Sequence, residues 1–149
     1  MLFPIIISCM VSESGKIRTD NELIEKFHKN RSIFEHFLAS FENSVDKEID
    51  VGDDPDVTIL LNKIDVIRIT NKTFNVKCPD VQFSVYSGGF AGGGSGKGYI
   101  YIGNPKNRDF VDKYKLVKSL DEVKINTHED CYVYRKIDGF WYLYYWYDG

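Results

Sequence analysis

The sequence predicts an α+β fold in which one long N-terminal amphipathic helix packs on a mainly antiparallel β-sheet, in two layers. Three observations predict it. Apolar residues recur at helical spacing between residues 19 and 45, short apolar or alternating runs typical of strands follow, and no helical crossover pattern separates those runs. Parallel strands need such crossovers, so antiparallel pairing is expected, with the helix covering one face of the sheet.

Length and composition favour one domain. The chain has 149 residues, of which 43% are hydrophobic, and this is enough to form a single core. We expect residues 1–18 to be a signal-like or tether-like segment and residues 19–149 to be one α+β domain. A net charge of −3 gives no overall positive field for nucleic acid. Asp109 and Asp112 interrupt the Lys- and Arg-rich stretch 106–118, which is interpreted as a solvated surface.

The long helix is predicted to begin at Thr19. Thr19 and Glu22 have the spacing of a capping box, in which each side chain bonds a free backbone N–H of the first turn. The apolar stripe that follows consists of Leu23, Phe27, Phe34, Phe37, Leu38, Phe41 and Val45. It predicts a helix of about six or seven turns whose aromatic residues belong to the core.

Residues 50–56 read DVGDDPD and raise the question of a calcium loop. A calcium loop of the EF-hand type needs Gly at its sixth position and Glu at its twelfth. Here Gly52 is third and Asn62 falls near the closing position, so the segment is interpreted as an acidic turn in which Pro55 stops the helix side. The three Cys and three His residues show no ligand spacing, so no metal site is predicted.

Strands are predicted through the rest of the chain. Val57–Leu61 is a short apolar run, and Asp109–Leu120 is expected to hold a short helix or an ordered loop. The clearest pair of strands flanks Asp138-Gly139, a strong hairpin signal. The predicted strand segments are Ile64–Ile69, Thr73–Lys77, Val81–Tyr86, Gly98–Ile102, Cys131–Ile137 and Phe140–Tyr147.

The segment from Gly88 to Tyr101 reads GGFAGGGSGKGYIY and invites comparison with a phosphate-binding loop. Such a loop reads GxxxxGK[ST] between a strand and a helix. Here Ala91 stands where the first glycine is required, and Gly98 stands where the hydroxyl residue is required. Strand-forming residues follow Gly98, so no helix N-terminus would face a phosphate. We therefore expect a mobile hairpin connection over Gly88–Gly98 and extended chain beyond Gly96.

No other catalytic constellation is evident, and the chain is expected to be non-enzymatic and without a cofactor. Ser95 lacks the flanks of GxSxG, and His128 beside Cys131 in sequence is not a catalytic pair, because base and thiol must meet in space. A concave patch formed by the glycine segment and the aromatic hairpin would offer a binding surface. Its candidate residues are Lys97, Tyr99, Tyr101, Arg135 and Trp141. Alternatively, these aromatic residues fill the core.

The N-terminus reads MLFPIIISCM, and Ile6-Ile7-Ser8-Cys9 fits the form of a bacterial lipobox. This predicts lipidation of Cys9 and a membrane anchor. The alternative is a short apolar strand with a buried Cys9 in a cytoplasmic protein. The segment is too short to span a bilayer as a helix. In an oxidising envelope Cys78 and Cys131 could form one disulfide, although the sequence alone leaves their pairing open.

The chain resembles small bacterial envelope lipoproteins of unknown function. The likeness rests on the lipobox-like Ile6–Cys9, on DNELIEKFHKN at Asp20–Asn30, and on GSGKGY at Gly94–Tyr99 combined with YRKIDGFWYLYY at Tyr134–Tyr145. The resemblance implies a location at the cell envelope, on the periplasmic face of a membrane, and it brings no catalytic residues.

The sequence therefore leads to a functional hypothesis with one alternative. We expect a non-enzymatic, envelope-associated binding or interaction module whose partner is another protein or an envelope component. The alternative is an immunity protein that neutralises a secreted toxin, which the small size and acidity of the chain would allow.

Overall fold

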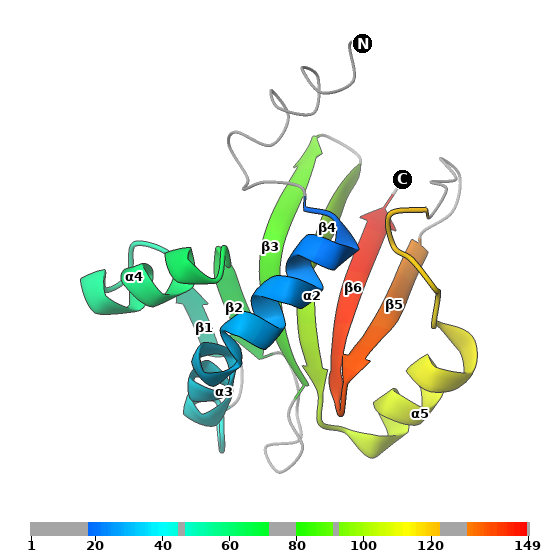
Figure 1. The fold of residues 1–149 in the computed structure, drawn as a ribbon, viewed down its shortest axis with the longest axis horizontal. Coiled ribbons are helices and arrows are strands. Elements are labelled where there is room, and N and C mark those ends of the chain that lie inside the picture. Colours follow the sequence, from blue (N-terminus) through cyan, green and yellow to red (C-terminus); the bar gives the residue numbers. More distant parts are fainter. Residues whose placement is uncertain (1–17, 45–46, 72–79, 91–92, 123–130, 149) are drawn as a thin grey trace.

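The computed structural model describes residues 18–44, 47–71, 80–90, 93–122 and 131–148. Within these ranges one six-stranded sheet, antiparallel throughout, has the order β1-β2-β3-β4-β6-β5 (Figure 1). The strands are β1 (Lys47–Asp50), β2 (Arg68–Asn71), β3 (Asp80–Phe90), β4 (Gly93–Ile102), β5 (Cys131–Asp138) and β6 (Trp141–Asp148). The α+β class and the antiparallel sheet are thus confirmed.

The single long N-terminal helix is not supported. Its predicted span holds two ten-residue helices, α2 (Asp20–Lys29) and α3 (Arg31–Ser40). Asn30 separates them, with φ −121° and ψ 26°, and its side-chain Nδ2 donates to the carbonyl of Lys26 at 3.0 Å. Such a bond between side chain and backbone competes with continuation of the helix. Thr19 is confirmed as the cap, since its Oγ1 accepts the backbone N–H of Glu22, whereas the Glu22 side chain accepts the Thr19 hydroxyl and not a backbone N–H.

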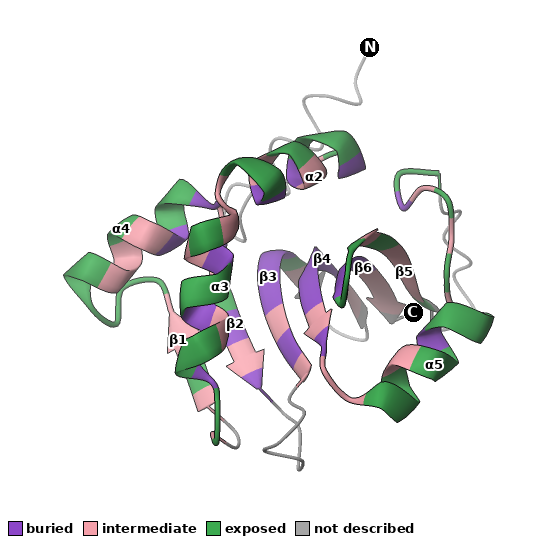
Figure 2. Ribbon diagram, turned by 60° about the horizontal axis from the view of Figure 1, so that its bottom comes forward, coloured by how far each residue is buried: buried purple, intermediate pink, exposed green. Residues whose placement is uncertain are grey.

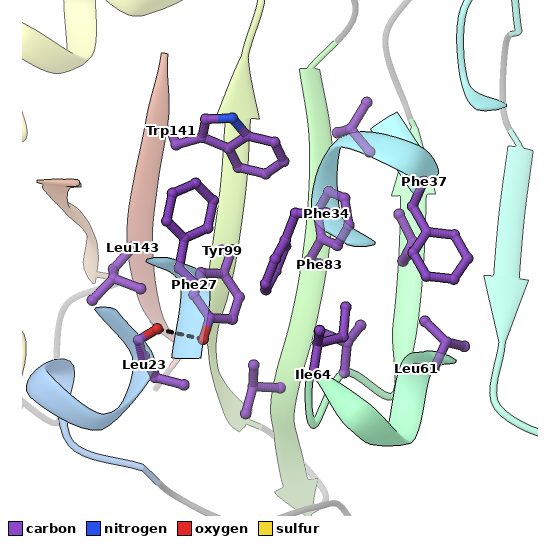
Figure 3. Packing of buried hydrophobic residues seen from close by; sticks show 14 of the residues in the cluster. Leu23, Phe27, Phe34, Phe37, Leu61, Ile64, Phe83, Tyr99, Trp141 and Leu143 are labelled. Atoms are coloured by element: carbon purple, nitrogen blue, oxygen red, sulfur yellow. Dashed lines mark hydrogen bonds between the residues drawn. The ribbon is translucent and has the colours of Figure 1, made fainter. Parts of the chain in front are cut away.

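An aromatic core lies between the sheet and the helices α2, α3 and α4 (Pro55–Lys63), as Figure 2 shows by burial. The ring of Phe34 lies with its centroid 4.7 Å from that of Tyr99 and 5.4 Å from that of Phe83. Phe27 packs 5.2 Å from Trp141 in the same layer (Figure 3). The apolar stripe predicted for one helix therefore faces the sheet from two.

Helix α4 and strand β1 were not predicted. Asp54 caps α4, because its Oδ1 accepts the backbone N–H groups of Asp56 at 2.9 Å and Val57 at 3.1 Å. Pro55 is the first residue of the helix, a position that needs no N–H donor. The interpretation of Pro55 as a stop signal was therefore wrong, and the apolar run from Val57 is helical.

This cap leads to a prediction. Asp54→Ala should lower the free energy of unfolding by about 1 kcal/mol, because two N–H groups lose their acceptor. Asp54→Asn keeps a side-chain oxygen at the cap and should change stability little. Urea unfolding of both variants checks the prediction, and equal losses would contradict the capping role.

Helix α5 (Pro105–Tyr114) lies on the other face of the sheet, so the arrangement is not strictly two-layered. Its Val111 packs against Ile100, Ile102, Tyr142 and Tyr144. The expectation of a short helix or an ordered loop in this part of the chain is confirmed, since a helix ends at Tyr114 and a segment with a single β-bridge at Leu116 follows.

Residues 115–121, here called the edge segment, pass around the outer edge of β5. Val117 N–H donates to the Tyr134 carbonyl at 2.8 Å, and Tyr134 N–H donates to the Lys115 carbonyl at 3.0 Å. Leu120 then enters the core on the opposite face of the sheet. The segment thus covers part of an edge strand whose N–H and C=O groups would otherwise be open to other chains.

Most of the predicted glycine connection is strand. β3 extends to Phe90 and β4 begins at Gly93, with Gly88 paired to Ser95. The prediction of extended chain beyond Gly96 is confirmed, since β4 runs on to Ile102. The hairpin at Asp138-Gly139 is confirmed as well, with Gly139 at φ +57°.

Four sequence predictions lie outside the described residues, namely the signal-like or tether-like segment as far as residue 17, the strand Thr73–Lys77 and the roles of Cys9 and Cys78. Lipidation and the disulfide between Cys78 and Cys131 therefore stay predictions. Among the helices that are described, none is long and apolar enough to cross a membrane.

Candidate functional site

Two of the predicted binding residues, Lys97 of β4 and Arg135 of β5, meet the same carboxylate at the start of α2. Lys97 Nζ lies 2.7 Å from Asp20 Oδ1, and Arg135 Nη1 donates to Asp20 Oδ2 at 3.0 Å. The backbone N–H of Leu120 also donates to Oδ2, at 2.7 Å. The side chains of Asp20 and Lys97 are only 1% and 6% exposed. This is a buried ion pair that joins the first turn of a helix to the sheet.

Asp121 of the edge segment completes the group, here called the ionic cluster (Asp20, Lys97, Asp121 and Arg135). Lys97 Nζ donates to Asp121 Oδ1 at 2.8 Å and to the carbonyl of Arg18 at 2.9 Å. The ammonium is close enough to Asp20 Oδ1 for an ion pair but is not aligned with it as a hydrogen bond. Asp121 also accepts the backbone N–H of Asp20 at 3.0 Å, where a carboxylate stabilises a helix N-terminus.

Opposing effects set the charge state of Asp20. Burial raises the pKa of its carboxyl, but the close contact with the positively charged Lys97 and the hydrogen bonds from Leu120 N–H and Arg135 outweigh burial and lower the pKa overall. Asp20 is therefore a carboxylate at neutral pH. In the nearby core, burial raises the pKa of Tyr99, whose hydroxyl donates to the Leu23 carbonyl at 2.7 Å (Figure 3).

The lowered pKa predicts a pH dependence of stability. A carboxyl whose pKa is lower in the folded state stabilises the fold above its unfolded pKa of about 3.9, and this contribution is lost as the pH falls through the folded pKa. Wild-type stability should therefore fall more steeply below about pH 4 than the stability of Asp20→Asn, which lacks the titrating group. Urea unfolding across this range measures both slopes, and parallel slopes would exclude Asp20 as a contributor.

The ionic cluster has a structural role, because it connects a helix to the sheet and to the edge segment. Two positive and two negative side chains join α2, β4, β5 and the edge segment, and buried charges need such pairing. Among the described residues, no group of three or more His, Cys, Asp and Glu side chains has an arrangement that would hold a metal ion.

The three predicted aromatic binding residues lie on the face of the sheet that α2, α3 and α4 cover. Tyr99 and Trp141 are buried in the core, and Tyr101 is half-buried with its ring 5.2 Å from that of Trp141. The structure thus brings all five candidates to one face, but three line the core and two belong to the ionic cluster. The concave aromatic patch expected from the sequence is not found at these residues, which fill the core as the alternative interpretation held.

A different surface exposes large apolar side chains. Phe110 and Tyr114 of α5 are 53% and 71% exposed, and Leu116 just beyond the helix is 41% exposed. The rings of Phe110 and Tyr114 lie 5.3 Å apart. We call these three residues, with Lys106 and Lys113, the α5 surface. The sequence signal was the four-residue spacing of the two rings, which places them side by side on the helix, within a stretch interpreted only as solvated.

A second exposed surface lies at the opposite edge of the sheet, around α4 (Figure 1). Ile59 is 65% exposed there, and the carboxylates of Asp53, Asp54 and Asp56 are exposed near the start of the helix. The two surfaces therefore differ in charge, one containing lysines and the other carboxylates.

Comparison with known proteins identifies no relative. No protein-family model matches the chain, and searches of curated proteins and of solved structures give no match.

Proposed function

We propose that this chain is a non-enzymatic, envelope-associated binding module that contacts another protein or an envelope component through the α5 surface. The observation that carries the proposal is the pair of neighbouring rings of Phe110 and Tyr114, both more than half exposed. Clusters of exposed apolar side chains rimmed by polar residues mark interaction sites. Val111 already packs this helix onto the sheet, so the fold does not need the two rings for its own packing.

The pairing of the polar residues supports a non-enzymatic role. Lys97 and Arg135, the cations singled out by the sequence, both contact Asp20 and do not face an open site. A nucleophile or base must reach its substrate, and these groups are engaged within the fold.

The envelope location is supported by the Ile6–Cys9 sequence alone. Intact-mass measurement of the chain produced in a bacterial host tests it. We expect a lipidated N-terminus at Cys9, and Cys9→Ser should abolish the lipid mass. A mature chain that keeps Met1 and an unmodified Cys9 would contradict this part of the proposal.

Photo-crosslinking in producing cells tests the binding module. A photoreactive amino acid replaces Tyr114 in one variant and Ile59 in a matched variant, since both positions are highly exposed but lie on different surfaces. A discrete protein or lipid adduct at position 114 that exceeds the adduct at position 59 supports the proposal. Adducts at position 114 no stronger than at position 59 would contradict it.

The alternative of an immunity protein is favoured by the surface around α4. Ile59 is exposed beside a carboxylate-rich turn, and such a surface suits a basic partner such as a nucleic-acid-cleaving toxin. In the same experiment a discrete protein adduct at position 59 alone would favour this alternative, because the acidic surface would then be the occupied one.

A further inference from the structure

We propose that the α5 surface docks on an anionic phospholipid bilayer, with Phe110 and Tyr114 at headgroup level and the lysines against phosphate groups. This inference rests on the proposed function, because it names the ligand of the same surface. Three observations carry it: local charge, the unpaired state of the lysines, and the position of the rings among them.

The charge of this segment is opposite to that of the whole chain. Residues 105–118 contain five basic and two acidic side chains, a net charge of +3, whereas the chain has a net charge of −3. The most carboxylate-rich described turn lies at the other edge of the sheet, beside α4 (Figure 1). In the field of an anionic surface, this asymmetry would turn α5 toward the membrane and α4 away from it.

The lysines are available for such a surface. In the described ranges no ion pair includes Lys106, Lys113, Lys115 or Lys118. In contrast, Asp112 accepts the Tyr142 hydroxyl at 2.7 Å. Asp109 and Asp112 are exposed on the same segment, so its outward charge is the excess of the lysines over these two carboxylates.

Helical spacing places the rings beside these cations. Phe110 follows Lys106 by four residues and precedes Lys113 by three, so the three side chains are neighbours on the helix surface. Val111 marks the buried side of α5, next to the rings, and much of the rest of the helix surface is exposed in Figure 2. Aromatic rings flanked by lysines suit a membrane interface, where rings lie among headgroups and lysines reach phosphates.

The type of cation favours a lipid over a protein as the ligand. Protein–protein interfaces are enriched in arginine and depleted of lysine relative to the rest of the surface. Here the unpaired cations are lysines, whereas Arg108 is engaged within the fold, with its guanidinium 3.6 Å from the Phe140 ring centroid. Headgroup phosphates need only a nearby positive charge, which a flexible lysine supplies.

Co-sedimentation of the full-length, unlipidated chain with vesicles tests the inference. One set of vesicles contains equal parts phosphatidylcholine and phosphatidylglycerol, and the other contains phosphatidylcholine alone. Binding to neutral vesicles measures the contribution of the apolar N-terminus, so the difference between the two sets reports the α5 surface. We expect tighter binding to the anionic vesicles, weakened by added salt.

Substitutions test whether the α5 surface is responsible for the tighter binding to anionic vesicles. Lys113→Gln should weaken anionic-vesicle binding by about five-fold, and Phe110→Ser with Tyr114→Ser by about ten-fold or more. Ile59→Ser is the matched control and should bind like wild type, since it removes an equally exposed apolar side chain from the other surface. Circular dichroism verifies that each variant is folded.

Equal binding to the two vesicle types, or α5 variants that bind like wild type, would overturn the membrane inference. A protein adduct at position 114 in the crosslinking experiment, together with no preference for anionic vesicles, would overturn this inference and leave the proposed binding module standing. No adduct at position 114 and no vesicle preference would remove both.

Discussion

Replacing Asp20 by asparagine is expected to lower the free energy of unfolding by about 3–5 kcal/mol, the cost of breaking a buried ion pair by removing one partner. Lys97, whose side chain is only 6% exposed, would lose its buried partner and keep only the 40% exposed Asp121. Arg135 would lose its carboxylate partner at the same time. Equilibrium urea unfolding at neutral pH, with the slope checked for two-state behaviour, measures the loss.

Two further variants make this prediction specific. Asp121→Asn should cost about 1 kcal/mol, because the Asp121 side chain is 40% exposed and solvent screens its interaction with Lys97. Asp20→Leu combined with Lys97→Met removes both buried charges and should be more stable than Asp20→Asn alone, since no buried ammonium then remains without its buried partner. A loss for Asp20→Asn no larger than that for Asp121→Asn would show that Asp20 is not the centre of the ionic cluster.

The sequence predicted best those features whose cause is local. The hairpin at Asp138-Gly139 depends on turn residues beside the strands, and the Thr19 cap depends on a residue three positions away. The break between α2 and α3 at Asn30 also has a local cause, the bond from the Asn30 side chain to the Lys26 carbonyl. It was not predicted because the apolar stripe continues through it at helical spacing. Pro55 was misread because proline, which cannot continue a helix, is also common at the first position of one.

The site could not be predicted as well, because its contacts join distant parts of the chain. Asp20 precedes its partner Lys97 by 77 positions, and no pattern within either segment specifies the other. The aromatic strands raised a different difficulty. In β6 both faces contain rings, Trp141 on one and Tyr142 on the other, so alternation alone does not reveal which face the helices cover.

Replacement of Gly98 by alanine is the second large effect we expect, with a loss of about 2–3 kcal/mol or more. A Cβ at this position would collide with the Phe83 carbonyl oxygen and lie 3.0 Å from the Val85 backbone nitrogen. Both atoms belong to β3 where the pairing register shifts between Ser84 and Tyr86. Relief would require the two central strands to separate, and urea unfolding measures that cost.

Gly96→Ala separates this backbone effect from a side-chain effect. The added Cβ would meet the indole ring of Trp146, the β6 residue that is paired with Gly96, and this ring covers the glycine. Trp146→Leu should therefore recover part of the loss in the double variant, whereas the same substitution should not rescue Gly98→Ala, because the obstacle at Gly98 is backbone. Rescue of both variants by Trp146→Leu, or of neither, would contradict this assignment. Partial rescue of Gly96→Ala alone would mean that Gly96 leaves room for a side chain and Gly98 for the neighbouring backbone. Close packing within the sheet would then explain the Gly-Lys-Gly sequence, which is followed by a strand and not by a helix.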